Sequence, residues 1–230
     1  IRTIEGEDGI QFAEKQIEAI KESMENGMVV ITGGPGTGKT TTINAIIKIF
    51  EDEGFKVNLA APTGRAAKRM TETTGREAKT IHRLLEYSFM EEDMMAFGLN
   101  EDSPLDTDLL IIDEASMIDI LLMNNLLKAI VPGTRLILVG DVDQLPSVGA
   151  GNVLKDIIDS GVVKVVELDQ IFRQAEESMI VVNAHRINKG EYPYLNEKEK
   201  DFYFIREDNP KIIADTIIDL CKDRLPNYYG

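Results

Sequence analysis

The segment Gly33-Gly34-Pro35-Gly36-Thr37-Gly38-Lys39-Thr40 decides which fold this chain of 230 residues can adopt. It fits the pattern G-x-x-x-x-G-K-[ST] at every fixed position, which is typical of loops that hold the phosphates of a nucleotide. Glycines let consecutive backbone N–H groups turn toward phosphate oxygens, and a helix that begins there points its positive end at the same charge. Lys39 can reach the β- and γ-phosphates, and the Thr40 hydroxyl can ligate Mg²⁺. The segment therefore predicts a site for Mg·ATP.

Buried strands and helices alternate on both sides of this loop. Short apolar runs bounded by glycine or polar residues indicate strands, and apolar residues at helical spacing indicate helices between them. Such alternation predicts an α/β fold of the P-loop NTPase type, with a parallel sheet covered by helices on both faces. The expected strands are Met28–Ile31, Lys56–Ala61, Leu109–Ile112, Arg135–Val139, Val163–Val166 and Phe202–Ile205, and the expected helices are 9–26, 38–53, 63–73, 117–130, 176–188 and 209–223.

One acidic stretch, residues 86–108, interrupts the alternation and contains glycine and proline. We interpret it as an insertion into a single domain that spans residues 1–230. Within it, Tyr87–Leu99 is expected to form a protruding β-hairpin with a solvated acidic turn at Glu91–Asp93.

A second motif, the pair Asp113 and Glu114, directly follows the apolar run Leu109–Ile112. An aspartate at the end of a buried strand can hold Mg²⁺, and the next glutamate can orient and deprotonate an attacking water. Acids after apolar residues are common, so the pair gains its meaning from the phosphate loop that precedes it. A hydrolase needs such a base, whereas a kinase or a nucleotide switch often does not.

Two further polar residues lie at or behind strand ends. Gln144 follows the strand that ends at Val139, and it is placed to sense a γ-phosphate if ligands bind at that edge. A solvated loop is the alternative interpretation. Arg173 is either a charge clamp or a surface residue, and composition does not decide between them. His82 and His185 have no metal-ligand spacing and are expected to serve packing or hydrogen bonding.

Composition and charge restrict the class of protein. The apolar content of 43% suits a globular domain, no apolar run is long enough to span a membrane, and the single cysteine, Cys221, allows no internal disulfide. We expect Cys221 to be buried and the protein to be cytoplasmic. The net charge of −15 disfavours nucleic-acid binding, but six basic residues against two acids between Pro62 and Arg83 form a local basic stripe. A solvated helix face would explain the stripe equally well.

Taken in chain order, these segments resemble the first RecA-like domain of superfamily 1 helicases, and above all the RecD/TraA group of 5′–3′ DNA helicases. The resemblance covers residues 9 to 225. Its most specific segments are Gly33–Thr41, Ala61–Met70, Thr80–Leu85, Ile112–Met117, Val139–Gly149 and Ile171–Gln174.

The resemblance implies roles for the matching positions. Gln16 would read the adenine edge, Asp113 and Thr40 would hold Mg²⁺, and Glu114 would be the base. Gln144 would couple the γ-phosphate to DNA, and Arg173 would stabilise the charge of the transition state. Lys39, at the phosphates, would be a further catalytic residue. The inserted hairpin would split the duplex. The nucleotide would be held by Gly34, Pro35, Gly36, Thr37, Gly38, Lys39, Thr40 and Thr41, and single-stranded DNA by Pro62, Thr63 and Arg65.

Superfamily 1 helicases have a second RecA-like lobe, and nothing after Arg173 matches it. We therefore expect one motor domain of a longer protein, with that lobe, single-stranded DNA, junctions of single- and double-stranded DNA and repair or recombination subunits as partners, and no membrane. Two rival classes are a P-loop phosphotransferase and a non-catalytic nucleotide switch. Glu114 argues against both, but a lobe without its partner would behave partly as a switch.

Overall fold

The computed structural model describes residues 1–89, 95–172, 177–195 and 201–229, and the chain divides into two compact units, residues 1–176 and 177–230. In the first unit the strands are β1 (Met28–Thr32), β2 (Val57–Ala61), β3 (Ala78–Thr80), β4 (Tyr87–Phe89), β5 (Met95–Phe97), β6 (Leu109–Ile112), β7 (Arg135–Gly140) and β8 (Lys164–Glu167). Its helices are α1 (Arg2–Asp8), α2 (Glu14–Glu25), α3 (Lys39–Asp52), α4 (Gly64–Thr74), α5 (Ile81–Leu84), η1 (Ala115–Met117), α6 (Ile120–Ala129) and α7 (Val153–Ser160).

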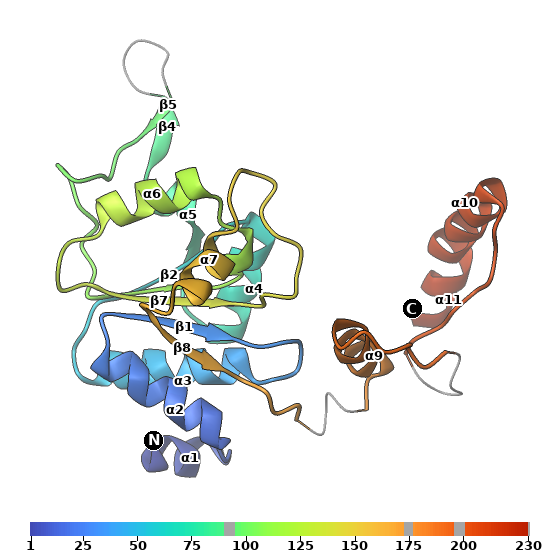
Figure 1. Cartoon of the computed structure of the whole chain (residues 1–230), viewed down its shortest axis with the longest axis horizontal. Helices are drawn as coiled ribbons and strands as arrows, with labels where there is room; N and C mark the ends of the chain where they lie inside the picture. The colour runs from blue at the N-terminus through green and yellow to red at the C-terminus, as the bar shows by residue number, and fades with distance from the viewer. Residues whose placement is uncertain (90–94, 173–176, 196–200, 230) are drawn as a thin grey trace. The chain divides into compact units, whose positions relative to one another are not determined.

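Six of the strands form one parallel sheet in the order β3-β2-β6-β7-β1-β8 (Figure 1). In the centre Thr32 is in register with Gly140, and Ile112 with Leu138. Because every strand runs the same way, the loops that follow β1, β2, β6 and β7 all leave from one edge of the sheet. This is the edge where open α/β sheets bind ligands.

Apolar clusters cover both faces of this sheet. One cluster contains Ile20 of α2 and Ile46 of α3, and the other contains Leu126 of α6 and Leu154 of α7. All four residues of β6 are buried, as expected for a strand between two helical layers. The predicted fold class, a parallel sheet with helices on both faces, is confirmed.

The insertion contains a β-hairpin, as predicted. Strands β4 and β5 pair antiparallel, with Tyr87 opposite Phe97, and Figure 1 shows them extending away from the main sheet. The rings of Tyr87 and Phe97 lie 4.6 Å apart, and His82 of α5 packs edge-on against Tyr87 at 5.4 Å. His82 therefore has the packing role expected from its sequence. The predicted acidic turn at Glu91–Asp93 lies outside the described residues.

The first unit differs from the sequence prediction in several places, and its helices α1 and α7 were not predicted. The helix expected over residues 9–26 begins at Glu14, because Gly9 ends α1 in the left-handed conformation with φ of 63°. Strand β3 was not predicted, since it is three residues long, half-buried and at the sheet edge. None of these differences changes the position of the phosphate loop between β1 and α3.

The second unit contains α9 (Met179–Asn188), α10 (Pro210–Asp219), η2 (Leu220–Arg224) and α11 (Leu225–Tyr229). The strand predicted over Phe202–Ile205 was wrong, because these residues adopt no regular structure and pair with no strand. Their neighbour Asp201 instead caps α9, accepting a hydrogen bond from the Met179 amide at 2.6 Å. Cys221 is exposed, contrary to expectation. Across the described residues, no helix has the length and apolar character required to cross a membrane.

Candidate nucleotide-binding site

The phosphate loop is shaped by contacts that exclude side chains at Gly38. This residue has φ of 81°, and a Cβ atom there would lie 2.4 Å from Gln16 Nε2 and 2.8 Å from the Phe172 ring. The Phe172 amide donates a hydrogen bond to the Gly36 carbonyl at 3.2 Å. Residues from α2 and from the segment behind β8 therefore hold the loop from outside, and only glycine fits between them.

Lys39 opens α3 and turns its ammonium group back into the loop. Its Nζ donates to the carbonyl oxygens of Gly33 at 2.5 Å and Gly34 at 2.9 Å. Burial lowers the pKa of Lys39, while the nearby carboxylates, chiefly Asp141, act in the opposite direction. Three acids thus favour the charged form of a lysine that sits where phosphates are expected to bind.

Asp113 and Glu114 follow β6 at the same sheet edge. The Asp113 amide donates to the Ala60 carbonyl at 3.0 Å, and Asp113 Oδ1 accepts from the Glu114 amide at 2.9 Å. Glu114 has φ of 54°, a conformation that non-glycine residues rarely adopt and that functional sites often contain. Burial raises the pKa of both carboxyl groups, and the charge of Asp113 raises that of Glu114 further. A raised pKa brings a carboxylate closer to the range of a general base.

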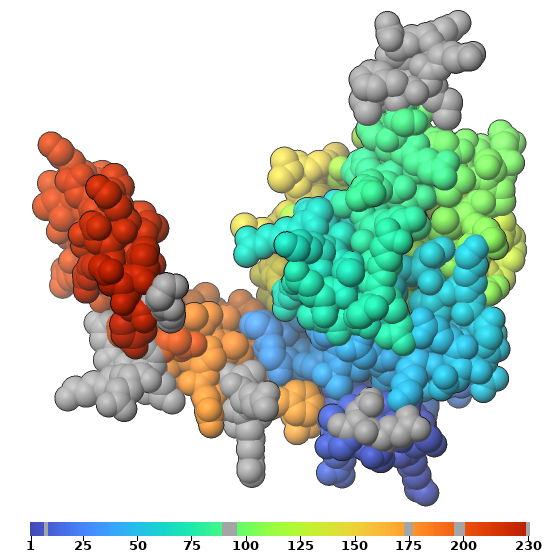
Figure 2. Space-filling view, turned by 180° about the vertical axis from the view of Figure 1, so that it is seen from behind, coloured from blue at the N-terminus to red at the C-terminus, as the bar shows by residue number. Residues whose placement is uncertain are grey.

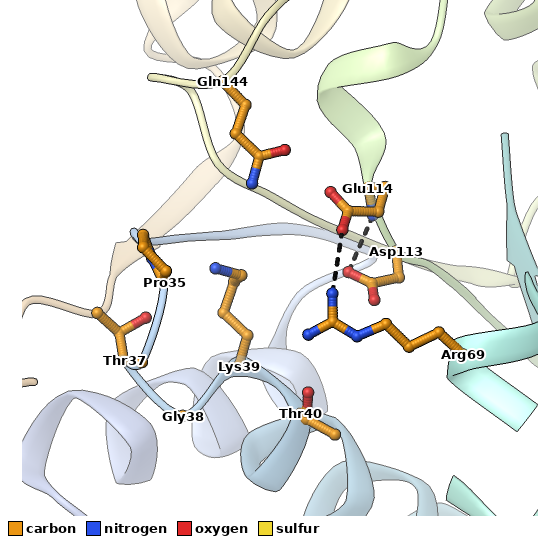
Figure 3. A pocket seen from close by; sticks show the side chains of 10 residues that line it. Pro35, Thr37, Gly38, Lys39, Thr40, Arg69, Asp113, Glu114 and Gln144 are labelled. Atoms are coloured by element: carbon orange, nitrogen blue, oxygen red, sulfur yellow. Dashed lines mark hydrogen bonds and ion pairs between the residues drawn. The ribbon is translucent and has the colours of Figure 1, made fainter. Parts of the chain in front are cut away.

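The end of β7 adds a third polar segment. Asp141 is buried, and its Oδ1 accepts from the Asp143 amide at 3.0 Å. The Gln144 side-chain amide lies 3.5 Å from the other Asp141 oxygen. Asp141 thus holds the turn together. Figure 3 shows the Gln144 side chain directed toward the phosphate loop.

These segments enclose one cavity of about 300 Å³, in which Lys39 lies opposite Asp113 and Glu114 (Figure 3). Its lining is polar and comes from four separate stretches of the chain. The lining residues are Pro35, Gly36, Thr37, Gly38, Lys39, Thr40, Arg69, Asp113, Glu114 and Gln144. The loop behind β1, the pair behind β6 and the glutamine behind β7 thus meet at one edge, where the parallel sheet predicts them.

Other predicted nucleotide residues lie elsewhere. Among the described residues, Gln16, Gly34 and Thr41 are outside the cavity lining, and Thr41 is exposed on α3. Gln16 is buried and braces the loop, since its amide nitrogen donates to the Gly38 carbonyl at 3.2 Å and its oxygen accepts from the Ala13 amide at 2.9 Å. Its adenine-reading role stays a prediction. Arg173 lies outside the described residues.

Arg69 and Asp141 are site residues that the sequence did not single out. Arg69 reaches the cavity from α4, and its Nη1 lies 3.8 Å from Glu114 Oε1. In the sequence Arg69 appeared only as one charge of the basic stripe, and Asp141 only as part of the loop before Gln144. One signal pointed to Arg69: α4 starts at the ligand edge, so cations in its first turns lie near that edge.

The segment predicted to contact DNA begins directly behind β2, next to β6. Thr63 is the N-cap of α4, and its hydroxyl accepts from the Ala66 amide at 3.2 Å. Pro62 is half-buried and Arg65 is exposed. Figure 2 shows the turquoise and green residues from α4 to β5 as one continuous surface that leads to the hairpin. The cavity and this surface are neighbours, because β2 and β6 are adjacent strands.

The donor set of the cavity fits a magnesium ion. Thr40 and Asp113 both line it, and a hydroxyl with a carboxylate is the kind of oxygen pair that holds Mg²⁺ beside nucleotide phosphates. Within the described residues, no group of three or more His, Cys, Asp and Glu side chains is arranged to hold a metal. Magnesium needs no such group, since it keeps several waters and binds substrate phosphates.

Comparison with known proteins agrees with this geometry. Residues 16–150, which include the phosphate loop, Asp113–Glu114 and Gln144, match the family described as AAA domain. The chain belongs to this family. The chain is also similar in sequence to helicases of the RecD type. It is 42% identical over 197 residues to the ATP-dependent RecD2 DNA helicase of Deinococcus radiodurans, a match that covers 86% of this chain. It is 36% identical over 197 residues to the RecBCD enzyme subunit RecD of Mycolicibacterium smegmatis, covering 75% of this chain.

The chain spans only part of the length of these relatives, 27% of the first and 35% of the second. Among solved structures it resembles Bacteroides Pif1 bound to ssDNA, with a TM-score of 0.57 and 22% identity over 93% of this chain and 56% of that chain. At this identity the likeness concerns the fold. Family and fold together establish a nucleotide-binding α/β domain of the RecA-like type, and the predicted RecD-type resemblance is confirmed.

Proposed function

We propose that this chain is the motor domain of a DNA helicase, which binds and hydrolyses Mg·ATP to drive movement along single-stranded DNA and the unwinding of duplex. The observation that carries this proposal is the shared cavity of Lys39, Asp113, Glu114 and Gln144, adjacent to the basic helix α4. A lysine, a metal-binding aspartate, a base and a γ-phosphate sensor are the parts that nucleotide hydrolysis requires.

Each residue receives a role from its chemistry. Lys39 would bind the β- and γ-phosphates with its ammonium group, which in this structure donates hydrogen bonds to two carbonyl oxygens of the loop. Glu114 would accept the proton of the attacking water. Thr40 and Asp113 would hold Mg²⁺, which supplies charge neutralisation between the phosphates when bound. Gln144 would report the state of the γ-phosphate to the DNA side, and Arg173 would stabilise the transition state.

The DNA part of the proposal rests on charge and on relatives. The basic stripe on α4 and beyond offers cations to a phosphate backbone, and Pro62, Thr63 and Arg65 begin it at the ligand edge. The curated relatives are named as a DNA helicase and as a RecBCD subunit, and the 5′–3′ direction is proposed from that likeness. The β4–β5 hairpin would separate the strands at a junction of single- and double-stranded DNA.

Steady-state ATP turnover with and without single-stranded DNA separates this proposal from its rivals. A motor is expected to hydrolyse ATP and to be stimulated by DNA. Transfer of the phosphate to a small acceptor instead of water would favour a phosphotransferase. Nucleotide binding without turnover in either condition would favour a switch and would contradict the role of Glu114.

We further propose that a second RecA-like lobe completes the motor, and that subunits of a repair or recombination complex are additional partners. The 230-residue chain alone would bind Mg·ATP but hydrolyse it slowly and unwind nothing. A lobe that supplies an arginine finger is worth about 10³–10⁵ in rate. The test compares ATP turnover of this chain and of the full-length protein at saturating single-stranded DNA. Equal turnover numbers would show that a second lobe is dispensable.

A further inference from the structure

Arg69 lines the nucleotide cavity although it belongs to α4, the helix that begins at the proposed DNA segment. Its Nη1 lies 3.8 Å from Glu114 Oε1, and Figure 3 shows the guanidinium extended toward the two acids. The Arg69 side chain is 71% exposed, whereas that of Glu114 is 23% exposed. One arginine thus joins a solvent-facing helix surface to the proposed catalytic base.

The main chain of Glu114 is fixed, so its side chain is the part that can change partner. The backbone amide is bound by Asp113 Oδ1, and the residue caps η1 in the left-handed conformation. Among the described residues, the cation paired with its carboxylate is Arg69. At 3.8 Å the contact is an ion pair, and the nearby positive charge acts to lower the pKa of Glu114, which makes the carboxylate a weaker proton acceptor.

Arg69 is also placed to meet a nucleic-acid backbone. It lies four residues after Arg65, so the two side chains share one face of α4. The helix is held rigid at its start by the Thr63 cap and against the sheet by the buried Ala67 and Met70. A phosphate held by Arg65 would therefore arrive within one helical turn of Arg69. A guanidinium binds carboxylate and phosphate with the same two-pronged geometry.

We infer that Arg69 is a positioning residue with two alternative anionic partners, the Glu114 carboxylate without DNA and a DNA phosphate when DNA is bound. In the first state it restrains the base, and in the second it releases the base for hydrolysis. This inference rests on the proposed motor function, and it identifies a physical link through which DNA on α4 would stimulate ATP turnover.

The first test measures ATP turnover of the full-length protein carrying Arg69→Gln. The DNA-free rate is expected to rise about two- to fivefold, the range that a partly exposed ion pair supports, and DNA stimulation to fall by a similar factor. Lys128→Gln is the matched control, because Lys128 forms an exposed pair with Glu101 at 3.7 Å outside both sites. A fall in the DNA-free rate would overturn the inference and make Arg69 a transition-state cation. An unchanged rate would also overturn it.

The second test uses binding alone. If Arg69 must leave Glu114 to bind DNA, removing the carboxylate charge frees it, since coupling between two partners is reciprocal. Glu114→Gln is expected to tighten nucleotide-free binding to single-stranded oligonucleotide by about two- to fivefold, and Arg69→Gln should abolish this gain. Asp113→Asn controls for the loss of one negative charge in the same cavity. A gain that persists without Arg69, or no gain at all, would contradict the two-partner role.

The outcomes also separate this inference from the proposed function. If the wild-type protein neither bound single-stranded DNA nor were stimulated by it, both the proposed motor function and the role of Arg69 would be contradicted. If DNA stimulates the wild type normally, and the ratio of ATP turnover with DNA to turnover without DNA is the same in Arg69→Gln, only the role of Arg69 would be contradicted.

Discussion

The two compact units of this chain bury their apolar residues to very different extents. Every side chain of β6 in the first unit is buried, whereas α10 in the second unit has no buried residue and its Ile217 is 54% exposed. The first unit holds its sheet between two layers of helices, so the strand ends that carry Lys39, Asp113 and Gln144 are fixed by a complete core. We infer that the nucleotide chemistry depends on the packed first unit, and three of the predictions below compare a residue of the first unit with a residue of the second.

The largest effect is expected from Glu114→Gln in the first unit. Loss of a general base lowers turnover by about 10²–10⁴ while nucleotide affinity is kept, because the amide retains the shape of the side chain but cannot take a proton. Glu207→Gln in the second unit is the control, since Glu207 accepts backbone hydrogen bonds from Asp208 and Asn209 at 2.9 Å that an amide oxygen can also accept. Steady-state ATPase and equilibrium nucleotide binding test the pair. Equal losses for both variants would break the contrast between the units.

Core truncation compares the stability of the two units. Ile111→Ala in β6 is expected to lower the free energy of unfolding by about 2–5 kcal/mol, because it leaves a cavity at a fully buried position. Ile217→Ala in α10 should change it by no more than about 0.5 kcal/mol. Urea denaturation followed by circular dichroism measures both. A comparable loss for Ile217→Ala would mean that α10 contributes to the core as much as β6 does.

A smaller effect is expected at the phosphate loop. Gly38→Ala forces a side chain into the left-handed region and against Gln16 and Phe172, a strain of about 1–2 kcal/mol, so nucleotide affinity should fall by about tenfold. Gly133→Ala is the control variant. It introduces backbone strain without a steric clash, because Gly133 has φ of 105° with open space around it and lies outside the cavity. Titration with a fluorescent nucleotide measures the affinity of both variants. A Gly133→Ala variant that loses affinity as strongly would contradict the local explanation.

The smallest effect concerns the DNA face. Arg65→Ala should weaken single-stranded DNA binding and lower the slope of log affinity against log salt by about 0.7, the value for one phosphate contact on a single strand. Nucleotide affinity should be unchanged. Arg206→Ala removes an exposed arginine of the second unit and should leave the slope intact. A titration over several salt concentrations that gives equal slopes for wild type and Arg65→Ala would remove Arg65 from the DNA path.

The sequence predicted the sheet and the phosphate loop well, for a physical reason. Buried parallel strands are continuous apolar runs, and a phosphate loop restricts residue type at fixed spacing, so β1, β6 and β7 were found with errors of a residue or so at their ends. Their common direction then placed Lys39, Asp113 and Gln144 at one edge. Local rules were sufficient there because the constraint is itself local.

Other features depend on contacts that no local pattern records. Arg69 enters the cavity from the side of a helix, and Asp141 is identified by its burial beneath Gln144 rather than by any motif. The apolar run Phe202–Ile205 resembles a strand, yet a strand requires a partner, and Asp201 caps α9 instead. Tertiary context decided each of these cases.

The most direct test of the central claim, that the sheet edge around Lys39 binds nucleotide, is a titration of wild type and Lys39→Ala with fluorescent ATP, with and without Mg²⁺. Lys39 supplies charge-assisted hydrogen bonds to phosphate, so its loss should weaken binding by about 10- to 100-fold. We predict saturable, magnesium-dependent binding by the wild type and this loss in the variant, with the fold unchanged by circular dichroism. Equal affinity of the two proteins for ATP would contradict the account.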